Sequence, residues 1–220
     1  MGIKAVIFDL DGVLLDSQPL HFEVDIALLR EFGVDAGHNI VDKHAGMTTH
    51  NRLSKYKRDF NLPQSFEEIW DANLRILNEK LDKEPLPKTD GIVELLEKIK
   101  GAGYKTAVAS SSSDSYVRKV LGQADLLRFF DILVNSDNVE NGKPAPDIFN
   151  KALRLLGVPP DSAVIFEDSR NGVLAAAAAG VKCIGYLNPT SGEQDLSAAS
   201  AVIGTFYDYE KIEKFIRGII

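Results

Sequence analysis

Three features are scarce in this sequence, and each scarcity excludes a class of protein. Cys183 is the single cysteine among 220 residues, so no internal disulfide can form, and a buried thiol in a reducing compartment is expected. No apolar run approaches the roughly 18 residues of a membrane span. The first residues lack the apolar stretch and cleavage site of a signal peptide. We therefore expect a soluble, cytoplasmic protein.

Positive charge is also scarce relative to negative charge. The sequence has 25 Lys and Arg residues against 32 Asp and Glu residues, which gives a net charge of −7. Surfaces that bind nucleic acid or anionic membranes are rich in basic patches, so we expect neither partner. A small anionic substrate remains compatible with this balance, because a metal ion or a lysine can reverse the local potential inside a cleft.

The apolar residues that are present recur in short runs rich in β-branched residues. Such runs, apolar without alternation, are typical of strands buried on both faces of a parallel sheet. Helical patterns separate the last four runs, and this alternation predicts an α/β fold with a doubly wound, Rossmann-like parallel sheet. The predicted strands are 5–8, 106–109, 132–134, 163–166 and 183–186, and the predicted helices between them are 92–99, 116–121, 148–156 and 172–179.

The interval between the first two predicted strands is much longer than a crossover helix requires. Within it, apolar residues recur at helical spacing in two stripes, and a proline-containing linker follows at 84–88. We therefore predict a helical cap domain over residues 17–84, placed above the carboxyl end of the first strand. The α/β catalytic core would comprise residues 1–16 and 85–220. The two stripes are Leu20, Val24, Leu28 and Leu29, then Ile69, Leu74, Ile76, Leu77 and Leu81.

Acidic side chains follow the first and fourth predicted strands. Asp9 and Asp11 are two residues apart on an extended chain, so both point to the same side, and Gly12 allows a sharp turn. Glu167 and Asp168 end the fourth strand in the same way. Ligands of open α/β sheets bind beyond the carboxyl ends of the strands. If the two strands are neighbours, these carboxylates converge and need a counter-charge, which Mg²⁺ supplies. Taken alone, the first pair could equally stabilise a turn.

A serine-rich turn and a lysine complete a possible phosphate site. Ser110 and Ser111 follow the second strand, where hydroxyl and backbone N–H groups near a helix start can bind phosphate oxygens. The alternative is a turn that only caps a helix. Lys143 lies in a loop, NGKPAPD at 141–147, whose glycine and prolines restrict the backbone. A lysine held in place in this way can offset negative charge, although a solvated surface lysine would be the ordinary interpretation of one lysine alone.

These four elements, in this order, resemble the haloacid dehalogenase superfamily of phosphohydrolases and phosphomutases. The stretches DGVLLDS at 11–17 and FEDS at 166–169 are most similar to its β-phosphoglucomutase and sugar-phosphatase branch. The resemblance implies that Asp9 attacks phosphorus and becomes an aspartyl-phosphate. It also implies that Asp11 protonates the leaving oxygen and then deprotonates the attacking group.

The resemblance also implies a cofactor and charge-neutralising groups. Mg²⁺ would be held by Asp9, the backbone carbonyl of Asp11 and Asp168, with Glu167 as a further candidate. Lys143 and Ser110 would offset charge on the transferring phosphoryl oxygens.

The cap residues are expected to select the substrate. His21 lies one helical turn after Ser17, so both should face Asp11. The mutase's cap loop carries lysine before a glycine and arginine three residues after it. Here Ala45 and Thr49 flank Gly46 at those places, and neither can bind a phosphate dianion as lysine or arginine can. Gly46 and Thr49 are nevertheless candidate substrate contacts. Whether His44, His50 or Arg52 contacts the substrate is left open.

The sequence therefore predicts a Mg²⁺-dependent phosphatase, a monomer that acts on a small phosphorylated metabolite such as a hexose phosphate. The cap loop lacks the lysine and arginine that bind a second phosphate in the mutase, which favours water as the acceptor of the phosphoryl group. Two alternatives remain open, namely a β-phosphoglucomutase-type isomerase and a non-catalytic protein that binds phosphate ligands on the same fold. The second would be expected to lack the nucleophile or the acid, and this chain retains Asp9 and Asp11.

Overall fold

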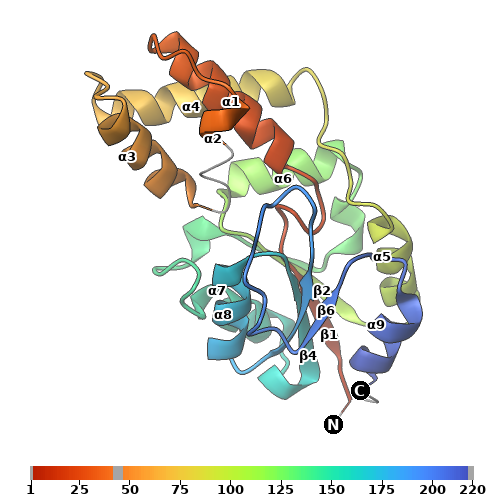
Figure 1. Ribbon diagram of the computed structural model, residues 1–220. Coiled ribbons are helices and arrows are strands. Elements are labelled where there is room, and N and C mark those ends of the chain that lie inside the picture. Colours follow the sequence, from red (N-terminus) through yellow and green to blue (C-terminus); the bar gives the residue numbers. More distant parts are fainter. Residues whose placement is uncertain (1, 42–46, 218–220) are drawn as a thin grey trace.

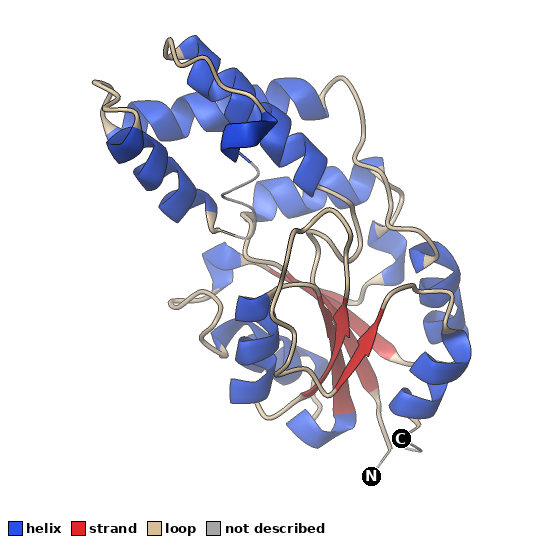
Figure 2. Ribbon diagram, in the orientation of Figure 1, coloured by secondary structure: helices blue, strands red, loops and turns tan. Residues whose placement is uncertain are grey.

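The computed structural model describes residues 2–41 and 47–217, and a parallel six-stranded sheet forms its centre (Figure 2). The strand order is β3-β2-β1-β4-β5-β6, so β1 lies between β2 and β4. The five predicted strands are confirmed, and a sixth, β6, was not predicted. The strands are β1 (Ala5–Phe8), β2 (Lys105–Ala109), β3 (Ile132–Val134), β4 (Ala163–Glu167), β5 (Lys182–Tyr186) and β6 (Ala201–Ile203).

The central strand is buried on both faces, as its unbroken apolarity predicts. Val6 and Phe8 of β1 belong to one hydrophobic cluster, whereas Ala5 and Ile7 belong to a second cluster on the opposite face. The Phe8 ring stacks on that of Phe166 in β4, with centroids 4.9 Å apart. Burial on both faces requires helices on both sides of the sheet.

Two layers of helices provide that cover (Figure 1). Helices α5 (Ile92–Gly101), α6 (Asp114–Gln123) and α9 (Tyr209–Ile216) contribute to the first cluster, and α7 (Asp147–Leu156) and α8 (Arg170–Ala178) contribute to the second. This arrangement confirms the predicted doubly wound α/β fold. Short 3-10 helices lie in the connections, among them η2 (Leu127–Phe129), η3 (Ser136–Asn138) and η4 (Pro160–Ser162).

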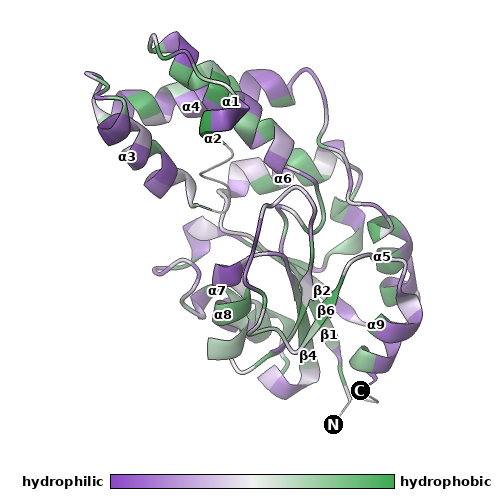
Figure 3. Ribbon diagram, in the orientation of Figure 1, coloured by the Kyte–Doolittle hydropathy of each residue, from purple (hydrophilic) through white to green (hydrophobic). Residues whose placement is uncertain are grey.

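Four further helices lie beyond the carboxyl ends of the strands (Figure 1). Helix α1 packs against α4, and both helices carry hydrophobic and hydrophilic residues (Figure 3). Leu74 was predicted to belong to the apolar stripe of α4, but it is 40% exposed, so that stripe is narrower than expected. The helices are α1 (Gln18–Glu31), α2 (His38–Val41), α3 (Thr49–Asp59) and α4 (Phe66–Leu81).

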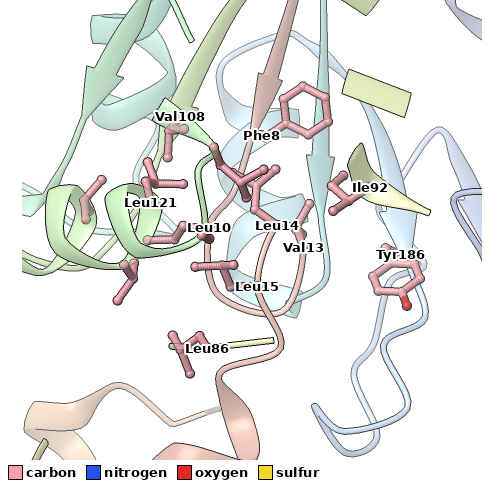
Figure 4. Close-up of a cluster of buried hydrophobic side chains, with 14 of the residues drawn as sticks. Phe8, Leu10, Val13, Leu14, Leu15, Leu86, Ile92, Val108, Leu121 and Tyr186 are labelled. Carbon is pink, nitrogen blue, oxygen red and sulfur yellow. The ribbon is translucent and has the colours of Figure 1, made fainter. Parts of the chain in front are cut away.

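Two chain segments connect these helices to the sheet, and they lie side by side. The backbone N–H of Asp16 donates to Pro87 O at 2.9 Å, and that of Thr89 donates to Leu14 O at 3.1 Å. Leu15 and Leu86 anchor both segments in one buried cluster (Figure 4). The connection is therefore seated in the hydrophobic core.

The structure also bears on two predictions, drawn from the single cysteine and from the lack of long apolar runs. Cys183 is buried in β5, and burial raises the pKa of its thiol. Across residues 2–41 and 47–217, no helix combines the length and apolarity needed to cross a bilayer.

Candidate active site

The carboxyl end of β1 brings Asp9 against Lys143. The Lys143 ammonium hydrogen-bonds the Asp9 carboxylate, Glu167 Oε1 at 2.7 Å and the backbone carbonyl of Ala109 at 3.0 Å. The Lys143 side chain is 5% exposed, so this lysine is buried and not a solvated surface group. Burial alone would lower the pKa of Lys143, but the carboxylates of Asp9 and Glu167 outweigh that effect and raise the pKa above its usual value.

Burial and neighbouring acids act together on Asp9. Burial raises the pKa of Asp9 well above its usual value. Lys143 opposes this shift, and nearby carboxylates, Glu167 first among them, add to it. Only an ionised carboxylate can act as a nucleophile, and a raised pKa favours the protonated form. Asp9 therefore needs further positive charge nearby if it is to act as a nucleophile.

Glu167 is hydrogen-bonded through both carboxylate oxygens. Its Oε1 accepts from Lys143, and its Oε2 accepts from the backbone N–H and hydroxyl of Ser169 at 2.9 and 3.0 Å. Gly172 makes room for it, because a Cβ at 172 would lie 1.8 Å from the Glu167 carboxyl. Glu167 is therefore turned toward Lys143, and its predicted place among the metal ligands stays a prediction.

Asp168 faces the other way, toward the turn after β1. Ser191 donates to Asp168 Oδ2 at 2.6 Å, and Asn188 donates to the backbone carbonyl of Gly12 at 3.0 Å. A Cβ at Gly12 would lie 2.0 Å from Asp168 Oδ2, so only glycine fits there. Burial, with the Glu167 charge second, raises the pKa of Asp168 to about 7. The sequence analysis did not identify Ser191 or Asn188.

The Asp11 carboxylate lies beside the loop and helix that follow β2. Ser112 donates to Asp11 Oδ2 at 3.0 Å, and the Tyr116 hydroxyl donates to Oδ1 at 2.9 Å. Burial, with the Asp11 charge second, raises the pKa of Tyr116, so this hydroxyl keeps its proton. Sequence reasoning missed both donors, because Tyr116 fitted a helix pattern and Ser112 was one serine of four.

The serine turn brings its polar groups to the start of α6. Ser110 is buried, and its hydroxyl accepts from the backbone N–H of Ser112 at 3.1 Å. Ser111 is exposed. The helix begins at Asp114, and the Ser113 side chain makes no capping hydrogen bond. The backbone N–H of Asp114 already donates to Asp137 Oδ2 at 2.9 Å, so an anion at this helix start would bind the N–H groups that follow.

Two cap residues face this site from α1. Ser17 is 2% exposed, and the His21 ring lies 6.4 Å from the ring of Tyr116, which contacts Asp11. Burial lowers the pKa of His21, and the charge of Asp11 opposes this shift. Substrate contacts from Ser17 and His21 stay a prediction.

The other cap candidates differ in position. Thr49 begins α3, Arg52 lies in its first turns, and the His50 ring packs 4.8 Å from that of Phe66. Arg52 Nε lies 2.7 Å from Asp25 Oδ2, and both side chains are buried. Gly46 and His44 lie outside the described residues.

Mg²⁺ is the predicted cofactor, and the remaining acids fit it. No group of three Asp, Glu, His or Cys side chains is arranged to hold a metal within the part of the chain that the structure describes. Since Glu167 is turned to Lys143, Asp9 and Asp168 are the side-chain candidates, with the Asp11 carbonyl as the predicted third ligand. Mg²⁺ usually binds few protein carboxylates and completes its shell with water and phosphate. Two buried acids with raised pKa values suit that demand.

Fold and site together define a doubly wound α/β protein with a buried carboxylate and an adjacent lysine at the carboxyl end of its central strand. Residues 6–186 match the family model of haloacid dehalogenase-like hydrolases, and the chain belongs to this family. This confirms the resemblance found in the sequence.

Several characterised relatives are similar over most of this chain. A "Phosphorylated carbohydrates phosphatase" from Thermotoga maritima is 33% identical, over 91% of this chain and 93% of that protein. A "Validoxylamine A 7'-phosphate phosphatase" from Streptomyces hygroscopicus is 28% identical, over 91% of this chain and 92% of its own. The crystal structure of CbbY from Rhodobacter sphaeroides in complex with phosphate superposes with a TM-score of 0.78, at 28% identity, over 93% of this chain and 95% of that one.

Proposed function

We propose that this protein is a Mg²⁺-dependent phosphatase that hydrolyses small phosphomonoesters, particularly sugar phosphates, through an aspartyl-phosphate on Asp9. The observation that carries the proposal is the buried contact of Lys143 with Asp9 at the carboxyl end of β1, beside Asp11. Two relatives named as phosphatases of phosphorylated carbohydrate-like substrates support the substrate class. A cytoplasmic monomer is part of the same proposal.

The proposed chemistry has two halves. A carboxylate oxygen of Asp9 attacks phosphorus, the ester P–O bond breaks, and Asp11 gives its proton to the leaving oxygen. Asp11 then takes a proton from water, which attacks the aspartyl-phosphate, releases inorganic phosphate and restores Asp9. Asp11 suits this role because, among the described residues, its oxygens contact hydroxyl groups and no lysine.

Other residues would offset the negative charge of the phosphoryl group and of the nucleophile. Lys143, Ser110 and the backbone N–H groups at the start of α6 would bind the phosphoryl oxygens. Mg²⁺, held by Asp9, Asp168 and the Asp11 carbonyl, would supply the positive charge that keeps the nucleophile ionised. Glu167 holds the lysine in place.

The cap favours water over a phosphosugar as acceptor. Arg52, the nearest candidate for binding a second phosphate, is buried and paired with Asp25 at 2.7 Å. Tyr56 donates to the same Asp25 oxygen at 3.0 Å. An arginine held by a buried carboxylate is a poor ligand for a second dianion, so the mutase stays the second candidate.

The test is phosphate release from a panel of hexose phosphates, with Mg²⁺ and with a chelator. We expect Mg²⁺-dependent release that Asp9→Asn abolishes and that the matched control Asp161→Asn, at an exposed carboxylate of the core, preserves. Rapid conversion of β-glucose 1-phosphate to glucose 6-phosphate with negligible phosphate release would replace the proposal by the mutase. Binding of hexose phosphates without turnover would replace it by the binding protein. Size-exclusion chromatography checks the monomer.

A further inference from the structure

Asp11 has a hydroxyl donor on each carboxylate oxygen. Tyr116 in α6 serves Oδ1 at 2.9 Å, and Ser112 in the preceding loop serves Oδ2 at 3.0 Å. Both donors come from the core, about a hundred residues away along the chain, so the orientation of this acid depends on the loop and helix that follow β2.

Tyr116 also meets the first cap helix. Ser17, at the N-cap position of α1, is buried and makes no capping hydrogen bond. The His21 ring in the first turn of α1 lies 6.4 Å from the Tyr116 ring. The phenol that contacts Asp11 therefore also lies beside α1.

We propose that Tyr116 is a positioning residue for the general acid, holding Oδ1 of Asp11 so that Oδ2 presents the proton to the leaving oxygen. The inference rests on the proposed function. Tyr116 on Oδ1 and Ser112 on Oδ2 would keep the carboxyl plane in one orientation through both half-reactions.

A comparison of leaving groups separates this role from a merely structural one. An alkoxide leaving from a sugar phosphate needs a proton in the transition state, whereas p-nitrophenolate leaves without one. The constant kcat/KM covers the steps up to transfer of the phosphoryl group to Asp9, so it reports the acid's contribution. Tyr116→Phe should lower kcat/KM for glucose 6-phosphate about tenfold or more, and for p-nitrophenyl phosphate less than about twofold.

The matched control is Tyr207→Phe. Tyr207 donates to Asp90 at the same distance of 2.9 Å, but it is 48% exposed and is not part of the candidate site. This variant should leave the ratio of the two kcat/KM values unchanged. Equal slowing of both esters by Tyr116→Phe would overturn the inference.

A double-mutant cycle with Asp11→Asn tests whether Tyr116 acts through Asp11. Tyr116→Phe should have no further effect on the residual activity of Asp11→Asn, and a further tenfold loss would overturn the inference. If Tyr116→Phe does not fold, Ser112→Ala probes the other donor and should also slow the sugar phosphate more than the aryl phosphate; equal slowing again overturns the inference. If the wild-type protein with Mg²⁺ hydrolyses neither ester, the proposed function itself fails, and the inference fails with it.

Discussion

A single methyl group at Gly172 should disrupt the lysine–carboxylate pair, although glycine-to-alanine changes within helices usually stabilise them. The helix-propensity gain is about 1 kcal/mol. Against it, the new Cβ would lie 1.8 Å from the Glu167 carboxyl, so that side chain must move. It would then lose its contacts with Lys143 at 2.7 Å and with the Ser169 N–H and hydroxyl at 2.9 and 3.0 Å.

The magnitude follows from those three contacts. Each hydrogen bond to a charged group contributes about 1.5–3 kcal/mol, and partial relocation of Glu167 would recover some of this. We expect Gly172→Ala to lower the free energy of unfolding by about 3 kcal/mol. For a chain of this length, that loss lowers Tm by about 6–12 °C. Because Lys143 loses one partner, kcat/KM for p-nitrophenyl phosphate should fall by about a hundredfold.

Gly101→Ala is the matched control, because Gly101 ends helix α5 and no atom lies within 4 Å of its added Cβ. It should keep full activity and raise Tm by up to about 4 °C. Thermal unfolding followed by circular dichroism, together with the phosphatase assay, measures both variants. If Gly172→Ala behaved like Gly101→Ala, Glu167 would not be held over α8 as described, and its role in orienting the lysine would be refuted.

Three further variants test the charges. Asp9→Asn should abolish Mg²⁺-dependent turnover while raising Tm, because it removes a buried carboxylate whose pKa is raised; a lower Tm would contradict this. Lys143→Met should lower the free energy of urea unfolding by about 3–5 kcal/mol, since two buried acids lose their cation, and an unchanged value would refute the pairing. In Arg52→Leu, Asp25 loses its cation; burial already raises its folded-state pKa, so ionisation opposes folding increasingly as pH rises. The variant should therefore be destabilised more at about pH 8 than at about pH 5 in urea unfolding. The exposed Arg75→Leu should change the free energy of unfolding little at either pH, and the opposite pH trend for Arg52→Leu would refute this.

The parts of the fold that could be predicted are those whose signal is local in the sequence. The unbroken apolar runs identify β1 to β5, because a strand covered on both faces has no polar positions to interrupt it. The pair Asp9 and Asp11 could be identified because both follow a strand directly. Strand β6 has three residues at the sheet edge and two of them are only half-buried, so its signal was too short and too mixed to predict it.

The contacts that complete the site depend on residues distant in the sequence. Tyr116 reaches Asp11 across 105 residues, and Ser191 meets Asp168 across 23. Nothing in the sequence around Tyr116 distinguishes this residue from an ordinary core position of a helix. The directions of Glu167 and Asp168 depend on their neighbours Lys143 and Ser191 and could not be predicted from adjacency alone.

The acids Glu167 and Asp168 are adjacent in the sequence but contact different partners. Counting the charges at the site shows how Asp11 differs from the other acids. When ionised, Asp9, Glu167 and Asp168 carry three negative charges, and Lys143 offsets one of them through direct contact with two. One Mg²⁺ would bring two positive charges, which balances these three acids without counting Asp11. Within residues 2–41 and 47–217, the donors to the Asp11 oxygens are hydroxyl groups, and no lysine or arginine pairs with this acid. A carboxylate oriented by neutral groups can accept and release a proton in turn, whereas one held by both a lysine and a metal stays ionised. The same sheet edge can therefore carry a fixed nucleophile and a mobile proton two residues apart.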